Sequence, residues 1–375
     1  MKKIKVAVVI PTHYDIHSSL QNLLKVYAHL IKKKALDVTI FTDEKNKVQY
    51  PGFSVEKIKG IDYKTVWEKA LFLLGIPRFW YTNLIGKLQG YDVIESSNPE
   101  FYGFAYQSYK AARRYNARLA YRTSQTMEGF YLFRLTKCLV IPTVRKAYRF
   151  ATALLFSNPQ AEERCYKLGL DRDRKKHIVI GHPTDTKCFR PMNVKKTGKA
   201  VLLSVGGLYK IKGHHLIIEA LKRVRDKGHK DAEVWIVGEG GYKESLQRLA
   251  ERLGVKEQVK FLGKKSHEEL AKIYNQSDIF VLANEQEITP AVNEAMACGK
   301  PVVVMDCGGR PFVIPDERHG MVAKKFDIED MANKILFLMN NRKEAAEMAQ
   351  KGRKHVLKNF TVEKVAEKIY RAIAK

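Results

Sequence analysis

The chain has 375 residues, 45% of them hydrophobic, and its 67 Lys and Arg outnumber 40 Asp and Glu to give a formal net charge of +27. Since this length exceeds what a single core usually serves, and the apolar content is ample, we expect two domains. No run of 18 apolar residues occurs, which excludes a transmembrane helix as an interpretation of the sequence.

The first half of the chain alternates short strands with helices. The alternation predicts a parallel, doubly wound α/β sheet whose first strand starts close to the N-terminus, so we expect no secretory signal. In such a fold the loop after the first strand binds ligands, which makes Thr12 and His13 candidate acceptor contacts, with a solvated loop as the alternative. The predicted strands are 5–10, 37–42, 53–57, 92–94, 117–122 and 154–157, and the predicted helices are 18–34 and 102–115.

Two basic stretches follow. Residues 64–90 mix aromatic side chains with Lys and Arg, which suits a bilayer interface or, alternatively, packing against the first domain's sheet. Between 101 and 150, ten Lys and Arg are opposed only by Glu128. This excess indicates an anionic membrane surface, nucleic acid or an acidic substrate, unless the bases only solubilise the surface. We favour peripheral membrane binding and consider nucleic acid unlikely, because no recognised binding motif is present.

The second half begins after a linker at 190–199. A strand at 200–205 opens it, and regular helices and strands follow to the end of the chain. We therefore predict a first domain at 1–190, a second at 191–359, and a final amphipathic helix within 360–375. The predicted helices are 214–227, 242–253, 266–275, 290–298, 328–340, 343–359 and 362–374.

Residues 278–305 carry the most functional information. An apolar strand, an acidic loop, Thr289-Pro290, a helix ended by Gly299, and a second strand follow one another. Thr at the N-cap and Pro at the first helical position indicate a helix start. Such a unit directs a helix N-terminus towards the carboxyl edge of a parallel sheet, where the amides of Ala291 and Val292 suit a phosphate. Glu294 lies one turn further on and could accept hydrogen bonds from ribose hydroxyls, which outlines a nucleotide-sugar site.

The segment Glu294-Ala-Met-Ala-Cys-Gly-Lys-Pro-Val-Val resembles the signature of family 4 glycosyltransferases. Further matches occur in order along the chain, covering about residues 150–375 well and the first 150 only by pattern. The resemblance implies the GT-B fold, in which two Rossmann-like doubly wound parallel-sheet domains face a cleft and the last helix returns to the first domain. The matching segments are 156–159, 185–191, 204–213, 236–240, 259–263, 307–311 and 319–320.

The resemblance also implies a reaction. It predicts transfer of a hexose from a nucleoside diphosphate sugar to a glycan or lipid-linked acceptor, with retention of anomeric configuration and without a metal or other cofactor. Lys212 would neutralise the diphosphate beside Gly206 and Gly207, and Gln286 and Glu287 compete to hold the transferred sugar. The other predicted donor contacts are Thr289, Pro290, Ala291 and Val292 at the pyrophosphate, Glu294 at the ribose, and Glu239, Phe261, Leu262 and Gly263 at the base.

Three positions depart from the family pattern. Gln286 stands where the family has a Glu eight positions before Glu294, and Gly207 stands where it has a phosphate-binding Arg, a charge that Lys210 or Arg310 could replace. Ser124 and Gln125, the remaining predicted acceptor contacts, lie where many members have a His. These departures leave two alternatives: a non-catalytic relative that only binds nucleotide sugars, or a basic protein that binds membrane or nucleic-acid surfaces.

The five cysteines indicate the redox environment in which the protein is expected to work. They are scattered, odd in number and without Cys-x-x-Cys spacing, so neither disulfides nor a structural zinc site is expected. A reducing cytoplasm is the simplest interpretation, with peripheral attachment to the cytoplasmic face of a membrane as the extension.

Overall fold

The structure is a computed structural model that describes residues 3–10, 18–33, 36–46, 50–61, 80–97, 103–123 and 133–374, without the side chains of 18–21 and 133–141. The chain divides into two compact units. The first domain comprises Met1–Pro183 with Val362–Lys375, and the second comprises Thr184–Thr361. The sequence placed these boundaries at residues 190 and 360. No helix among the described residues is long and apolar enough to cross a membrane.

The first domain contains a parallel sheet with strand order β3-β2-β1-β6-β7-β8-β9. Strands on both sides of β1 pair with it in parallel, which is the arrangement of a doubly wound sheet. A separate antiparallel pair joins β4 (Gly60–Ile61) to β5 (Trp80–Tyr81). The bounds are β1 Ile4–Val9, β2 Leu36–Asp43, β3 Ser54–Ile58, β6 Val93–Ser97, β7 Arg118–Thr123, β8 Ala153–Phe156 and β9 His177–Val179.

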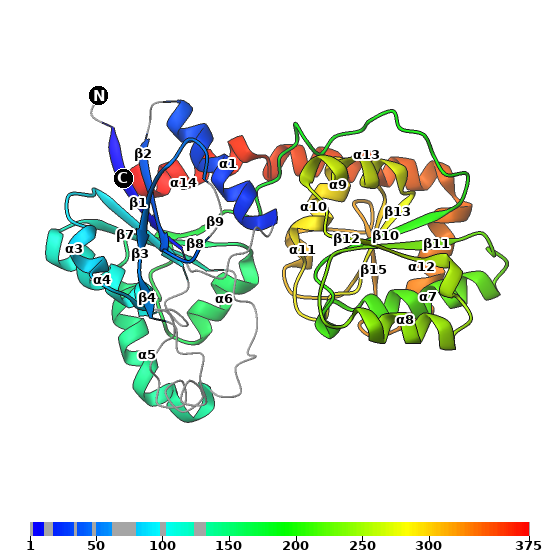
Figure 1. The fold of residues 1–375 in the computed structure, drawn as a ribbon, viewed down its shortest axis with the longest axis horizontal. Helices are drawn as coiled ribbons and strands as arrows, with labels where there is room; N and C mark the ends of the chain where they lie inside the picture. The colour runs from blue at the N-terminus through cyan, green and yellow to red at the C-terminus, as the bar shows by residue number, and fades with distance from the viewer. Residues whose placement is uncertain are drawn as a thin grey trace. The chain divides into compact units, whose positions relative to one another are not determined.

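Helices cover this sheet, and one of them comes from the far end of the chain. The helix α14 (Val362–Ala374) lies beside α1 (Ser18–Lys32) in Figure 1. Its residues Val365, Ile369 and Ile373 are buried in the same core as Val8 of β1. The first domain therefore depends on the C-terminal segment for part of its core. Its other helices are α3 Leu84–Lys87, α4 Gly103–Tyr115, α5 Phe133–Phe150, α6 Pro159–Lys167 and the 3-10 turn Arg174–Lys176.

The second domain has a six-stranded parallel sheet with order β12-β11-β10-β13-β14-β15. Numbered within the domain this is 3-2-1-4-5-6, the order of the dinucleotide-binding fold, and it places the switch point between β10 and β13. The bounds are β10 Val201–Val205, β11 Glu233–Val237, β12 Val259–Gly263, β13 Ile279–Leu282, β14 Val302–Met305 and β15 Met321–Ala323.

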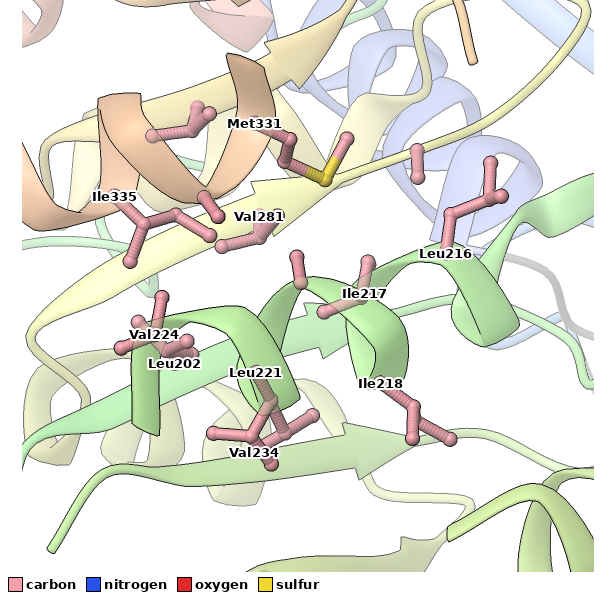
Figure 2. Packing of buried hydrophobic residues seen from close by; sticks show 14 of the residues in the cluster. Leu202, Leu216, Ile217, Ile218, Leu221, Val224, Val234, Val281, Met331 and Ile335 are labelled. Atoms are coloured by element: carbon pink, nitrogen blue, oxygen red, sulfur yellow. The ribbon is translucent and has the colours of Figure 1, made fainter. Parts of the chain in front are cut away.

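Amphipathic helices pack on both faces of this sheet. Figure 2 shows α7 (His214–Asp226) directing Ile217, Leu221 and Val224 towards the sheet, with Met331 of α12 in the same cluster. Local signals fix several helix starts, such as the reciprocal capping box of Ser266 and Glu269 at α9. The remaining elements are α8 Lys243–Arg252, α9 His267–Gln276, α10 Pro290–Ala297, α11 Arg310–Val313, α12 Ile328–Asn340, α13 Arg342–Asn359 and the 3-10 turns 210–212 and 256–258.

The predicted fold class is confirmed, since both units are Rossmann-like parallel α/β domains. The predicted elements recur with shifts of a few residues at their ends. The sequence did not indicate α5, α6 or β9. The helix α5 carries Pro142 in its interior, which argues against a helix at the level of local propensity.

Candidate functional site

The predicted donor residues gather at the carboxyl edge of the second domain's sheet. The loop 206–213 follows β10 and leads into α7, and the loop 283–289 follows β13 and leads into α10. These two strands are neighbours in the sheet and flank its switch point. This is the place where open α/β sheets bind their ligands.

Glycines allow the loops at this edge to pack tightly. Gly213 has φ +69, and a Cβ there would collide with the carbonyl oxygen of Ala283. A Cβ on Gly238, after β11, would likewise collide with the carbonyl oxygen of Gly206. Because only glycine fits at these points, backbone rather than side chains forms the floor of the site.

Lys212 is the cation of the glycine loop. Its side chain is half-buried, which lowers its pKa, while the nearby carboxylate of Glu287 acts in the opposite direction. Its backbone N–H donates to the carbonyl of Tyr209 at 3.0 Å, which fixes the turn that carries it. A half-desolvated ammonium group acts more strongly on an anion than one in bulk water.

The two competitors for the sugar contact, Gln286 and Glu287, lie in an extended loop. Gly308 donates to the carbonyl of Gln286 at 2.9 Å, and Ile288 donates to Gly308 at 2.8 Å, so this loop runs extended beside residue 308. Successive side chains alternate in extended backbone, and Ile288 is buried in the core. Glu287 therefore projects from the other side of the loop, and it is the residue whose charge acts on Lys212.

The start of α10 differs in detail from the prediction. Thr289 occupies the N-cap position but makes no side-chain capping hydrogen bond, and Pro290 is the first helical residue. The amide of Val292, predicted to face a phosphate, donates instead to the carbonyl of Thr289 at 3.1 Å. Thr289 Oγ1 is buried and has no hydrogen-bond partner among the described residues. The helix start thus presents a hydroxyl that the sequence had assigned to capping.

Glu294 lies deep in the site. The residue is 1% exposed, and its Oε2 accepts a hydrogen bond of 3.1 Å from the hydroxyl of Tyr274. The same hydroxyl lies 3.1 Å from the carbonyl of Ala291, so Tyr274 links the carboxylate to the first turn of α10. Burial beside Glu294 raises the pKa of Tyr274 well above its ordinary value. The carboxylate is therefore held in one position against the helix start.

The residues predicted to seat the base lie at the ends of β11 and β12. Gly238 donates to the carbonyl of Gly263 at 3.0 Å, which joins the two strand ends. Glu239 is exposed, and its Oε1 lies 4.0 Å from the position of a Cβ built on Gly263. Phe261 and Leu262 are half-buried in β12. Glu239 and Gly263 are thus neighbours, as expected if both contact the same nucleobase.

One residue of this site was missed by sequence reasoning. His214, the first residue of α7, is 1% exposed and its Nδ1 lies 3.1 Å from Ser204 Oγ. Burial lowers its pKa to about 4, so the imidazole is neutral beneath Gly206. The sequence feature that could have identified His214 is its position directly after the Lys212-Gly213 pair. Of the candidate replacement cations, Arg310 is engaged by Asp306 at 3.2 Å, and Lys210 is exposed.

The predicted acceptor contacts cannot be placed. Thr12, His13, Ser124 and Gln125 lie outside the described residues, as does most of the aromatic stretch 64–90. Among the residues that the structure does describe, no group of three or more His, Cys, Asp and Glu could hold a metal ion.

Comparison with known proteins shows what the second domain resembles. Residues 185–355 match the model of glycosyl transferases group 1. Curated relatives include spore coat protein SA of Bacillus subtilis, 28% identical over 46% of this chain. They also include a GDP-mannose-dependent alpha-(1-6)-phosphatidylinositol monomannoside mannosyltransferase of Mycolicibacterium smegmatis, 31% identical over 56% of the chain. The chain spans about half the length of these relatives, 48% and 55% respectively.

Solved structures resemble the chain over its whole length. Anabaena Alr3699/HepE, crystallised with UDP and glucose, covers 99% of this chain and 100% of its own with a TM-score of 0.78 and 16% identity. Sucrose-phosphate synthase of Thermosynechococcus elongatus covers 98% of each chain with a TM-score of 0.76 and 18% identity. At such identities the likeness establishes the fold, and that fold is GT-B.

Proposed function

We propose that this protein, a member of the glycosyl transferases group 1 family with the GT-B fold, transfers a hexose from a nucleoside diphosphate sugar to a glycan or lipid-linked acceptor. The observation that carries the proposal is the convergence on one sheet edge of a glycine-floored loop, the half-buried Lys212 and the N-terminus of α10. These are the groups that stabilise a leaving diphosphate where no metal does so.

We assign protein residues to each part of the donor. Lys212 and Thr289 Oγ1 bind the diphosphate, the first as a cation and the second as a hydroxyl donor at the helix start. Glu294 accepts from the ribose hydroxyls, since a fixed carboxylate can take two such charge-assisted bonds. Metal independence belongs to this proposal: Lys212, Thr289 Oγ1 and the N-terminus of α10 would offset the leaving group's charge in place of a metal.

For the transferred sugar we assign Glu287 rather than Gln286. The carboxylate of Glu287 acts on Lys212, which supports a shared place for both charges beside the bond that joins the diphosphate to the sugar. A carboxylate there can both accept from sugar hydroxyls and stabilise an oxocarbenium-like centre, whereas the neutral amide of Gln286 can only hydrogen-bond. This assignment keeps a negative charge in the site although residue 286 itself carries none.

The stereochemical part of the proposal is retention. Support for retention comes from the resemblance of the sequence to retaining glycosyltransferases. We infer that an oxygen of the donor phosphate takes the acceptor proton on the same face of the sugar from which the phosphate leaves. The bond from the anomeric carbon to phosphate breaks, the bond to the acceptor oxygen forms, and the proton moves to the phosphate.

For the acceptor we propose a molecule held at an anionic membrane. Support comes from the first domain, where Lys110, Arg113 and Arg114 of α4 are exposed. Lys110 Nζ lies 4.9 Å from the ring centroid of Tyr106, which mixes aromatic and basic character on this helix. One relative acts on a phosphatidylinositol mannoside by its name, which is consistent with a lipid-linked acceptor here.

Donor turnover tests the proposal. The purified protein is incubated with UDP-, GDP- and ADP-hexoses and candidate acceptors in the presence of a chelator, and release of the nucleoside diphosphate is followed. We expect release from one donor class, and a product that NMR identifies as having the donor's anomeric configuration. An inverted product would refute the retaining mechanism. Tight donor binding without turnover for any acceptor would favour the non-catalytic alternative.

A further inference from the structure

Tyr209 is an aromatic side chain on the donor loop that the assignments above do not use. It is 57% exposed, although it lies between Gly207 and Lys212 at the carboxyl edge of the sheet. Leaving most of a tyrosine ring in water forgoes the stabilisation that burial of its apolar surface would contribute. An exposed aromatic residue at a ligand-binding edge therefore suggests that a bound ligand covers the ring.

The ring lies in the space next to Gly207. A Cβ built on Gly207 would lie 2.7 Å from Tyr209 Cε2 and 3.0 Å from Cδ2, which is closer than real Cβ contacts. Any side chain at residue 207 would thus displace the ring. Backbone hydrogen bonds hold Tyr209 in the loop, since its N–H donates to Gly207 at 2.9 Å and its carbonyl accepts from Lys212 at 3.0 Å.

The loop that carries the ring lies beside residues predicted to seat the base. The carbonyl oxygen of Glu239 lies 3.7 Å from the same built Cβ on Gly207, and Leu208 donates to that oxygen at 2.8 Å. The carboxylate of Glu239 is in turn beside Gly263. Tyr209, Glu239 and Gly263 therefore follow one another across the ends of β10, β11 and β12.

We propose that Tyr209 is the stacking platform for the nucleobase of the donor, and that glycine at 207 is required to seat its ring. This inference rests on the proposed function, because it assigns a further residue to the same donor site. An aromatic face stacks on any base, so Tyr209 contributes affinity, while the neighbouring carboxylate of Glu239 can accept from base N–H groups and contribute selectivity. The family pattern has a phosphate-binding Arg at the position of Gly207. In this protein, the glycine thus gives up that phosphate contact and makes room for a base contact.

Calorimetric titration of UDP, GDP and ADP into Tyr209 variants tests the inference. For the nucleotide that binds, we expect Tyr209→Ala to raise Kd about tenfold or more, the range of losing one base–aromatic stack, and Tyr209→Phe to change it about twofold or less. Gly207→Ala should resemble Tyr209→Ala because its methyl group displaces the ring. Phe337→Ala is the matched control, since Phe337 is 43% exposed on α12 of the same domain and should leave Kd unchanged.

A second readout isolates the base. In Tyr209→Trp, the new indole should be quenched by the nucleoside diphosphate and left unquenched by inorganic pyrophosphate at the same concentration. Equal losses in Tyr209→Phe and Tyr209→Ala would overturn stacking in favour of a hydroxyl contact. Unchanged Kd in Tyr209→Ala would overturn the inference alone. Failure of the unmodified protein to bind any nucleotide would instead contradict the proposed function.

Discussion

The two domains share a sheet topology around their first strands, but their described residues differ in chemistry. In the second domain, glycines at 206, 213 and 238 bring backbone close to backbone. In the first, a charged pair lies within the described strands of the sheet: Glu95 of β6 is fully buried, with its carboxylate 3.7 Å from Arg122 of β7. Burial raises the pKa of Glu95, and the Arg122 charge lowers it in part.

Under the proposed function, the two domains bind two kinds of ligand, the nucleotide-sugar donor and the acceptor. A diphosphate is the same in every nucleotide sugar and can be met by glycine-rich backbone and one cation, so its site carries a recognisable sequence pattern. Acceptors vary, and a site made of side chains can vary with them. This comparison predicts that the second domain holds the conserved chemistry of transfer and the first holds the specificity.

The largest expected effect concerns Lys212. Lys212→Ala should lower turnover about a hundredfold or more, the cost of losing one electrostatic stabiliser of the transition state. Lys351→Ala, which removes an exposed lysine from α13, is the control and should retain full turnover. Steady-state rates with the preferred donor measure both. Unchanged turnover in Lys212→Ala would remove the cation from the mechanism and weaken the contrast between the domains.

The second effect is acid sensitivity of the donor domain. The pKa of His214 is lowered to about 4 in the folded state from an ordinary 6.5, so the unfolded chain binds more protons between these values. Stability from the neutral imidazole is complete above pH 6.5 and is lost as pH falls through this window, by about 2 kcal/mol at pH 5. Urea unfolding at pH 7 and pH 5 should show this loss.

The control for acid sensitivity is a pair of glutamine variants. His214→Gln should reduce the difference in unfolding free energy between the two pH values, because its side chain does not titrate. His229→Gln, at a partly exposed position, should retain the difference shown by the unmodified protein. If His214→Gln keeps the full difference, another group is responsible.

A smaller effect distinguishes the two neighbours in the acidic loop. Glu287→Gln should lower turnover about tenfold, because it removes one charge-assisted interaction with the sugar, while Gln286→Ala should cost less. The two variants are compared by kcat at saturating donor. A larger loss in Gln286→Ala would transfer the sugar contact to the amide and would contradict the alternation argument for this loop.

The smallest effect belongs to the first domain. Lys110→Ala should weaken partition onto vesicles containing anionic lipid about fivefold, near 1 kcal/mol for one base at the membrane surface. Binding should also weaken with added salt. Lys351→Ala in the second domain should leave partition unchanged. Equal partition onto neutral and anionic vesicles, or equal effects of both substitutions, would refute a membrane-facing first domain.

Sequence reasoning was most successful where chemistry depends on backbone. The strand–loop–helix unit around Thr289 and the glycine loop ending at Gly213 could be predicted because caps and glycines are local signals. At Thr289 the structure differs from the prediction, because the same hydroxyl group can either cap the helix or bind a ligand. Propensity cannot decide whether that hydroxyl turns to its own helix or away from it.

The rest of the site depends on contacts between distant residues. Nothing local to Tyr274 indicates that its hydroxyl meets Glu294 twenty residues later. The same holds for Tyr209, whose position follows from the empty space at Gly207, and for His214, whose neutrality follows from burial. Helix α5 was missed because Pro142 disfavours a helix locally, and tertiary packing of Val144 and Ala147 outweighs that preference.

The most direct test of the donor site is calorimetric titration of UDP, GDP and ADP without metal into the unmodified protein and Glu294→Gln. The account predicts that one nucleotide binds with micromolar affinity and that the substitution, which keeps the shape and removes the charge, weakens it about tenfold or more. Absence of binding by all three nucleotides, or equal affinity in Glu294→Gln, would contradict a nucleotide-sugar site at this sheet edge.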